Sequence, residues 1–292
     1  MCCNKKTVFI AIIIVALAAF GIHFLTQKTT TGLNIKEIKS YAQVVGEMAT
    51  ADPQTLILFD TDETLVTSPD VFARDYPLPP SFIIQGILKH PSLLFKKNRE
   101  QLESLIMTHA QRKLIDPLVI ELINSLKSKG CTVLVLTQFR TRPYGIVTDP
   151  VKNRYEMLKN FGVELSLTYP DFKFTTLPSK GGGYPELHNG ILFANELTKG
   201  QALEGFLDHF KIRPSKVILF DDMEKNLISV GNLCKKLNIP FQGYLYLAKK
   251  HFSAWNTKRA LLQLDNILEH GKWLSDAEAD AMLQGKPAVV AH

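Results

Sequence analysis

The chain has 292 residues, of which 46% are hydrophobic and 21% are charged, and its formal net charge is +6 at pH 7. This is ordinary globular composition, long enough for one large α/β domain with an insertion, and the positive charge favours anionic substrates or surfaces. The sequence has no dense Lys/Arg cluster with interleaved aromatic residues and no CxxC pair, so it gives no sign of nucleic-acid binding, a zinc site or a disulfide framework.

The amino-terminal segment, residues 1–33, differs in kind from the rest. Residues 8–25 are apolar apart from His23, and Lys5 and Lys6 precede them. A run of this length can just span a bilayer as a helix. A cleaved signal peptide is the alternative, but no clear small-x-small cleavage site follows the run. We therefore expect a single-pass membrane anchor, with a cytoplasmic amino terminus and the globular part outside the cytoplasm.

Residues 34–270 are expected to form one catalytic domain, followed by a helix and tail at 271–292. In the first half, Asn34 is expected to cap a helix that runs to about Ala49. The segment 66–116 is too long for a simple connection, and its helical pattern predicts a cap inserted over the site. The other expected elements of this half are a strand at 55–59, helices near 81–89, 98–113 and 117–129, and a strand at 131–136.

The second half continues the alternation of strands and helices. Residues 171–195 carry short apolar pieces separated by glycines and predict a small β-hairpin insertion. The expected elements are a helix at 150–160, a short strand near 163–167, a helix at 198–210, a strand at 217–220, a helix near 224–236, a strand at 241–247, and helices at 259–270 and 275–284.

Three of the predicted strands end abruptly in reactive polar residues. The strand at 55–59 stops at Asp60-Thr61-Asp62, the strand at 131–136 stops at Thr137, and the strand at 217–220 stops at Asp221-Asp222. Short, non-alternating apolar runs are typical of parallel strands buried on both faces. Ligands bind beyond the carboxyl ends of such strands. The acidic and hydroxyl groups are therefore predicted to meet at one edge of the sheet, an arrangement suited to a metal ion and a phosphate.

The same residues resemble the four motifs of the haloacid dehalogenase superfamily. Asp60-x-Asp62-x-Thr64 is similar to the first motif and Thr137 to the second. Lys199, at the start of a helix, suits the third, and Asp221-Asp222-x-x-x-Asn226 suits the fourth. The resemblance covers about residues 50 to 250. It implies an α/β fold with a Rossmann-like, doubly wound parallel sheet.

Phosphate chemistry assigns roles to these residues. Asp60, first at the strand end, is the candidate nucleophile that would form an aspartyl phosphate. Asp62, two residues on, is the candidate acid and base for the leaving group and for water. The backbone N–H groups of Thr61 and Asp62 can donate hydrogen bonds to phosphate oxygens. Mg²⁺, which favours carboxylate oxygens, would offset the repulsion between the nucleophile and the phosphate.

The resemblance completes the site. It implies that Asp60, the main-chain carbonyl of Asp62, and Asp222 hold Mg²⁺, with Asp221 in support, and that Thr137 and Lys199 bind the phosphoryl group. Lys180 is the rival for the phosphate-site lysine. Two arginines after the second strand, Arg140 and Arg142, are expected at the surface or in a substrate pocket.

Asp62 favours the phosphatase branch of this superfamily. The segment with Gly190-Ile-Leu-Phe193 and Lys199-Gly200-x-x-Leu203 is also similar to a poorly characterised group from intracellular bacteria, loosely related to class B acid phosphatases. We therefore predict a membrane-anchored, Mg²⁺-dependent phosphomonoesterase acting on a phosphorylated small molecule. The alternatives are a phosphoprotein or phosphoinositide phosphatase acting on a host or envelope partner, and a non-catalytic binding module.

Overall fold

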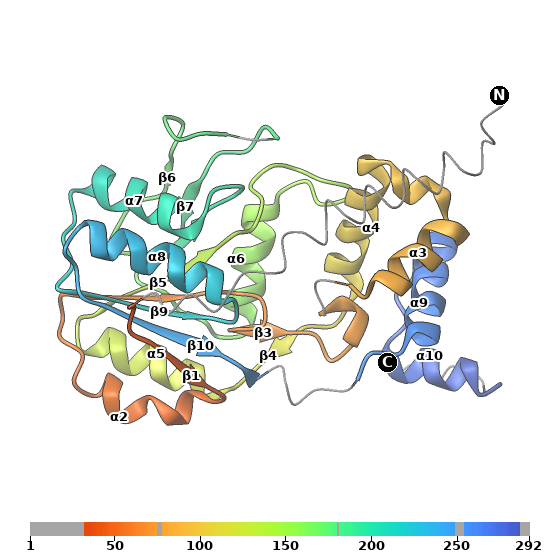
Figure 1. The fold of residues 1–292 in the computed structure, drawn as a ribbon, viewed down its shortest axis with the longest axis horizontal. Coiled ribbons are helices and arrows are strands. Elements are labelled where there is room, and N and C mark those ends of the chain that lie inside the picture. Colours follow the sequence, from red (N-terminus) through yellow and green to blue (C-terminus); the bar gives the residue numbers. More distant parts are fainter. Residues whose placement is uncertain (1–31, 75–77, 180, 249–253, 287–292) are drawn as a thin grey trace. The chain divides into compact units, whose positions relative to one another are not determined.

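The computed structural model describes residues 32–74, 78–179, 181–248 and 254–286 (Figure 1). The chain divides into two units, Met1–Leu33 and Asn34–His292, and the fold described here is that of the second. In the described part of the chain, no helix is long and apolar enough to cross a membrane. The predicted anchor at residues 8–25 lies outside the described residues.

A mainly parallel sheet forms the centre of this unit (Figure 1). Among the described residues, eight strands hydrogen-bond in the order β1-β10-β9-β2-β5-β8-β7-β6. All neighbours from β1 to β8 are parallel, and β7 and β6 are antiparallel additions at one edge. The sheet is thus compatible with the predicted Rossmann-like class. The bounds are β1 Ile35–Ile38, β2 Thr55–Phe59, β5 Thr132–Thr137, β6 Phe172–Lys173, β7 Glu186–His188, β8 Ile191–Phe193, β9 Lys216–Asp221 and β10 Phe241–Tyr246.

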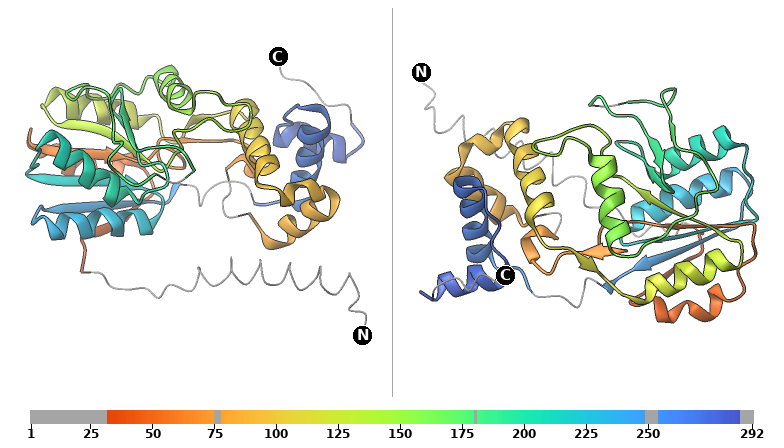
Figure 2. Two further views of the ribbon diagram at one scale, coloured as in Figure 1. Left: turned by 90° about the horizontal axis from the view of Figure 1, so that it is seen from above. Right: turned by 180° about the vertical axis from the view of Figure 1, so that it is seen from behind.

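Helices cover both faces of the sheet (Figures 1 and 2). Side chains alternate along a strand, so Ile57 and Phe59 belong to one hydrophobic cluster and Leu56 and Leu58 to the other. Helices α2, α5 and α6 contribute to the first cluster, and α7 and α8 to the second. Their bounds are α2 Val45–Met48, α5 Leu118–Ser128, α6 Pro150–Asn160, α7 Lys199–Phe210 and α8 Glu224–Lys236.

An aromatic stack fixes the relative height of three neighbouring strands beneath the site. The rings of Phe59 on β2 and Phe220 on β9 are stacked at 4.7 Å, and Phe220 stacks on Tyr244 of β10 at 4.8 Å. These residues are also direct register partners. The N–H of Asp60 donates to the Phe220 carbonyl at 2.9 Å. The acidic residues that follow on β2 and β9 therefore emerge side by side.

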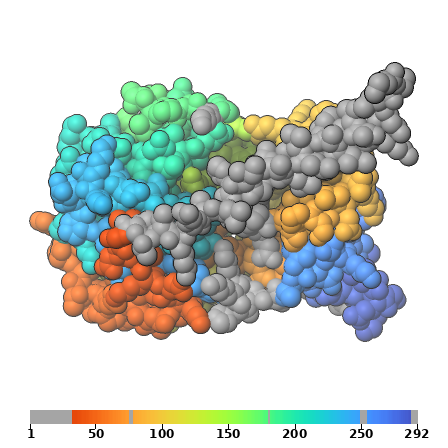
Figure 3. All heavy atoms as spheres, viewed as in Figure 1, coloured from red at the N-terminus to blue at the C-terminus, as the bar shows by residue number. Residues whose placement is uncertain are grey.

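The cap is built from two distant parts of the chain. The antiparallel pair of β3 (Val66–Thr67) and β4 (Lys113–Leu114) leads into and out of the insertion, which carries α3 (Pro80–Lys89) and α4 (Lys96–His109). Figure 3 shows these helices beside the chain's last two, α9 (Thr257–His270) and α10 (Asp276–Leu283), on one side of the molecule. A small core joins the two segments: Phe72, Phe82, Leu93, Ala260 and Leu264.

Ion pairs fasten this cap to the loop after β5. Arg140 pairs with Glu103 at 2.6 Å, and Arg142 pairs with Glu100, both glutamates lying on α4. The same loop approaches α4 closely at Gly145, where an added Cβ would stand 1.9 Å from the hydroxyl oxygen of Ser104. Arg140 and Arg142 thus bind the cap.

The helix expected at 34–49 is wrong for its first half. Residues Ile35–Ile38 form β1, which pairs with the edge strand β10. Ser40 then begins a new turn with a capping box, and the Tyr41 hydroxyl donates to the Thr64 carbonyl at 3.0 Å. The three-residue spacing of Ile35, Ile38 and Tyr41 imitates helical periodicity, but pairing with a strand some 200 residues away determines the conformation.

The strand expected near 163–167 is also wrong, because those residues have no regular structure. Residues 190–193, expected inside the hairpin insertion, instead contribute β8 to the main sheet, parallel to β5. Asn189 and Gly190, both at positive φ, make the tight turn from β7 into β8. The predicted hairpin therefore exists, but its strands extend the eight-stranded sheet, and β8 also pairs with β5.

Candidate functional site

The loop after β2 presents two aspartates with different surroundings. Asp60 is only 8% exposed, whereas the side chain of Asp62 is 45% exposed. The chain turns sharply here: the N–H groups of Leu65 and Val66 donate to the Thr61 carbonyl, and Glu63 adopts a left-handed φ of 57°. The turn leaves Asp60 inside the site and Asp62 at its mouth.

Lys199 lies between the acidic ends of two strands. Its Nζ is 2.6 Å from Asp60 Oδ1 and 2.5 Å from Asp221 Oδ2, and its side chain is 1% exposed. Thr198 caps α7 through a capping box, so Lys199 is the first residue of the helix. Gly200 permits close packing on α8, because an added Cβ would stand 2.5 Å from the Ser229 carbonyl oxygen.

The second carboxylate oxygen of Asp221 is held by the start of α8. Asp221 Oδ1 accepts from the backbone N–H of Met223 at 2.9 Å and from the Asn226 side chain at 3.0 Å. Asp221 is fully buried, and each of its oxygens therefore has a donor. Its orientation, and with it the position of Lys199, is fixed by hydrogen bonds from three residues.

Three carboxylates gather at this edge of the sheet. Asp60, Asp221 and Asp222 offer oxygens that all lie within 4.8 Å of one another, and Lys199 pairs with the first two. Burial raises the pKa of Asp60 to about 7; the Lys199 charge opposes this rise, and the Asp221 charge adds to it. Burial would lower the pKa of Lys199, but the two carboxylates outweigh it and raise that pKa. Clustered carboxylate oxygens are a donor set that fits Mg²⁺.

Asp62 is paired with a residue that the sequence analysis did not single out. Arg154 Nη1 donates to Asp62 Oδ1 at 2.9 Å, from a side chain that is 1% exposed. Burial alone would raise the pKa of Asp62, but Arg154 and then Arg112 outweigh it and hold that pKa below its usual value. The available signal was the position of Arg154 on the buried stripe of α6, shared with Val151 and Leu158.

Threonines line the strand ends. Thr61 and Thr64 are fully buried, and neither hydroxyl has a hydrogen-bond partner among the described residues. Thr137 ends β5 and is 2% exposed, and its carbonyl accepts from the Ala194 N–H at 2.8 Å. An unpaired buried hydroxyl is unfavourable. Thr61 directly follows Asp60, so one of these two hydroxyls lies next to the candidate nucleophile in the chain.

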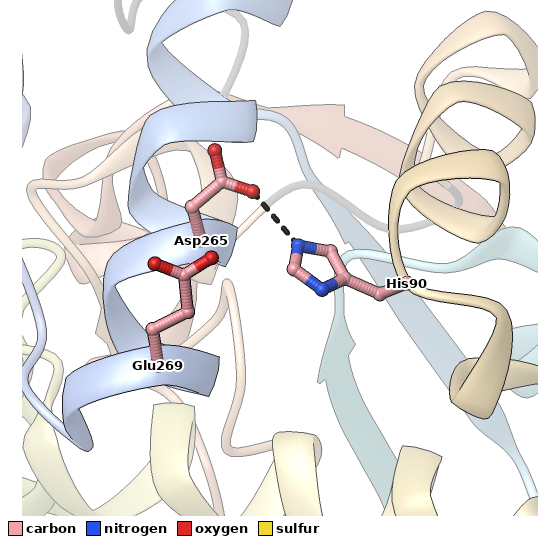
Figure 4. Close-up of side chains that lie close together, drawn as sticks. All are labelled: His90, Asp265 and Glu269. Carbon is pink, nitrogen blue, oxygen red and sulfur yellow. Dashed lines mark hydrogen bonds and ion pairs between the residues drawn. The ribbon is translucent and has the colours of Figure 1, made fainter.

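Lys180, the rival phosphate-site lysine, lies outside the described residues. Of the two candidates, Lys199 has a described place beside Asp60. A second group with metal-ligand types, His90, Asp265 and Glu269, lies in the cap (Figure 4). There His90 hydrogen-bonds Asp265 at 2.8 Å, and Lys89 pairs with the same carboxylate. These bonds join α3 to α9, which makes the group a clamp within the cap.

The fold and the site together define an α/β protein with a mainly parallel sheet and an acidic, lysine-bridged cluster at the carboxyl ends of its strands. Residues 34–280 match the family described as "Protein of unknown function (DUF2608)", and the chain belongs to this family.

The chain is also similar to curated proteins of intracellular bacteria. It is 24% identical to an uncharacterised protein of Rickettsia prowazekii, over 80% of this chain and 84% of that protein. It is 26% identical to a candidate outer membrane protein of Chlamydia pneumoniae, over 85% of this chain and 88% of that protein. A haloacid dehalogenase-like hydrolase from Streptococcus pneumoniae aligns over 64% of this chain and 82% of its own, with a TM-score of 0.33 and 15% identity, which is too distant to support an argument.

Removing the ammonium group of Lys199 should lower the stability of the folded protein considerably. Lys199→Met keeps the length of the side chain but leaves two buried carboxylates without their counter-charge, so the free energy of unfolding should fall by about 3–5 kcal/mol. Lys236→Met is the matched control, since Lys236 pairs with Glu204 at 2.6 Å while 67% exposed, and it should have far less effect. Urea denaturation of both variants measures the difference. Equal losses would contradict the described burial of Lys199.

Proposed function

We propose that this protein is a Mg²⁺-dependent phosphomonoester hydrolase of the haloacid dehalogenase-like type, acting through an aspartyl phosphate on Asp60. One observation carries the proposal: the Lys199 ammonium group bridges Asp60 and Asp221 at 2.6 and 2.5 Å, at the carboxyl ends of adjacent parallel strands. Phosphoryl transfer needs an in-line nucleophile and neutralisation of charge, and this cluster offers both.

In the first step, a carboxylate oxygen of Asp60 attacks phosphorus, and the bond from phosphorus to the leaving oxygen breaks. Asp62 gives its proton to that oxygen. The paired Arg154 holds Asp62 ionised in the free protein, so Asp62 takes up its proton when the phosphate arrives, because a nearby dianion raises the pKa of a carboxyl group. Lys199 and the orphan Thr61 hydroxyl are the proposed phosphate contacts, with Thr137 at the neighbouring strand end.

In the second step, water attacks the phosphorus of the aspartyl phosphate. Asp62, now ionised, takes the proton of that water, and the bond from phosphorus to Asp60 breaks. Inorganic phosphate and the original carboxylate are the products. The ion pair with Arg154 keeps Asp62 ionised before this step and orients its carboxylate.

The metal site is proposed at Asp60, Asp221 and Asp222, together with the main-chain carbonyl of Asp62. A bound Mg²⁺ would supply positive charge to the phosphoryl oxygens as they approach the carboxylates. The donor set supports this proposal, because the carboxylate oxygens of these three residues all lie within 4.8 Å of one another.

The proposed location is the cell envelope, with residues 8–25 as the anchor. Support comes from the apolar run and from relatives in Chlamydia trachomatis and Chlamydia pneumoniae that are named as candidate outer membrane proteins. Alkaline carbonate extraction should leave the full-length protein in the membrane pellet. An intact soluble form beginning near Thr29 would instead show that the segment is a cleaved signal.

Hydrolysis of para-nitrophenyl phosphate should depend on metal. Chelation with EDTA should abolish it and added Mg²⁺ should restore it, because the carboxylate cluster repels an anionic substrate. Asp222→Asn should raise the Mg²⁺ concentration needed for half-maximal rate. Asp208→Asn, on an exposed part of α7, is the control for loss of one acidic group. Full activity in EDTA would overturn the metal assignment, and no turnover with any metal would favour a non-catalytic binding module.

The two aspartates of the β2 loop should fail at different steps. Asp60→Asn should abolish the phosphoenzyme, because an amide cannot form it. Asp62→Asn should still be phosphorylated by para-nitrophenyl phosphate, whose leaving group needs no proton, but should lose roughly 10²–10⁴-fold in turnover as water activation fails. Acid quench followed by mass spectrometry locates the phosphate. Phosphate on any residue other than Asp60 would refute the mechanism.

A further inference from the structure

A cavity of about 300 Å³ lies between the cap and the core. The end of α4 and the segment before β4 supply Met107 and Arg112, the loop after β5 supplies Phe139 and Tyr144, and α6 supplies Arg154. The walls are thus apolar and aromatic with two guanidinium groups among them. Ligand pockets commonly combine such walls with a few fixed polar groups.

The two arginines have hydrogen-bonding capacity left over. Arg112 donates to the Ala73 carbonyl at 3.5 Å and to the Met107 sulfur at 3.2 Å, both weak acceptor contacts. Within the described ranges, no carboxylate forms an ion pair with Arg112. Arg112 Nε and Arg154 Nη2 are buried without a partner among the described residues. Buried guanidinium donors without acceptors are unfavourable, and an anion would satisfy them.

The cavity adjoins the reaction site through Arg154. Its Nη1 contacts Asp62, and its guanidinium lies 3.9 Å from the centre of the Phe139 ring, in the cavity wall. Asp62, the proposed donor of the leaving-group proton, thus contacts a residue of the cavity wall. Asp62 is hydrogen-bonded to Arg154, whereas Arg112 Nε in the same wall is buried without a partner among the described residues.

We propose that this cavity binds the leaving group of the substrate and that Arg112 selects esters whose leaving group carries a second anionic group, a carboxylate or a second phosphate. The inference rests on the proposed phosphomonoesterase activity. Arg112 acts as a specificity-determining residue with its planar donors, and the aromatic walls receive the carbon skeleton between the two anions. Arg154 orients Asp62 and borders the same space.

Matched substrate pairs test this proposal with the full-length protein. 3-Phosphoglycerate and glycerol 3-phosphate differ by a carboxylate in place of a hydroxymethyl group, and fructose 1,6-bisphosphate and fructose 6-phosphate differ by a second phosphate. The kcat/KM of the wild-type protein should favour the anionic member of at least one pair, and the pair that shows the preference identifies the anion. Arg112→Gln should reduce this preference by roughly 10- to 100-fold, mainly through KM, as expected for a charged hydrogen bond.

Two further variants separate the guanidinium from charge in general. Arg112→Lys keeps the charge but loses the planar fork, and should recover only part of the preference. Lys152→Gln removes one positive charge from an exposed position on α6 and should leave the preference intact. Thermal melting shows whether each variant is folded. Equal kcat/KM values within both pairs, or a preference unchanged by Arg112→Gln, would overturn the proposal even if the protein hydrolyses para-nitrophenyl phosphate.

Measuring ligand binding by calorimetry makes the test independent of turnover. If the wild-type protein hydrolyses neither para-nitrophenyl phosphate nor any of these esters, the proposed function fails, and binding of the same pairs can then be measured directly by titration. Tighter binding of the anionic member, lost in Arg112→Gln, would support the cavity as an anion site. Equal binding of both members would refute it.

Discussion

The ammonium group of Lys199 lies in the protein interior between the carboxylates of Asp60 and Asp221, and the arrangement of the site depends on this contact. Neither carboxylate could be buried alone at a reasonable cost, because a charge without a partner in a medium of low polarity is strongly unfavourable. The aromatic stack of Phe59, Phe220 and Tyr244 sets the strands level beneath them, so that one lysine reaches both acids. The ion cluster and the aromatic stack therefore both keep the ends of β2 and β9 aligned.

Next to that acidic cluster, the cap contributes the wall residues of an arginine-containing cavity. Arg140 and Arg142 hold α4 against the loop after β5, and both of these segments line the cavity that Arg112 and Arg154 share. Asp62 lies at the border between the two regions, since it follows Asp60 in sequence but pairs with Arg154. The proposed proton transfer and the proposed choice of leaving group thus meet at a single carboxylate.

Much of the central sheet could be predicted from the sequence because its signals are local. An apolar run that stops at a polar residue marks a strand and the edge where its polar side chains gather, and β2, β5 and β9 carry that mark with Asp60, Thr137 and Asp221. The mainly parallel α/β sheet followed from such runs. The convergence of Asp60, Asp221 and Asp222 was an expectation of the same kind, and the structure places their oxygens together.

Other parts depend on partners far away in the chain, and local patterns could not reveal them. β1 takes its conformation from β10, and its isoleucine spacing imitated a helix. Arg154 looks like one more polar residue of an amphipathic helix until α6 is packed, and only its place on the apolar stripe hints at burial. The alignment of β8 with β5 was hidden because a tight turn at Asn189-Gly190 suggested a self-contained hairpin.

The two-part construction of the cap has a consequence for how the protein is made. A ribosome releases α3 and α4 long before α9, so the apolar side chains of Phe72 and Phe82 must wait for Leu264 at the far end of the chain. During that interval the nascent cap exposes hydrophobic surface, while the strands of the central sheet can already pair. The cap therefore becomes complete only after α9 has been synthesised, well after its own α3 and α4.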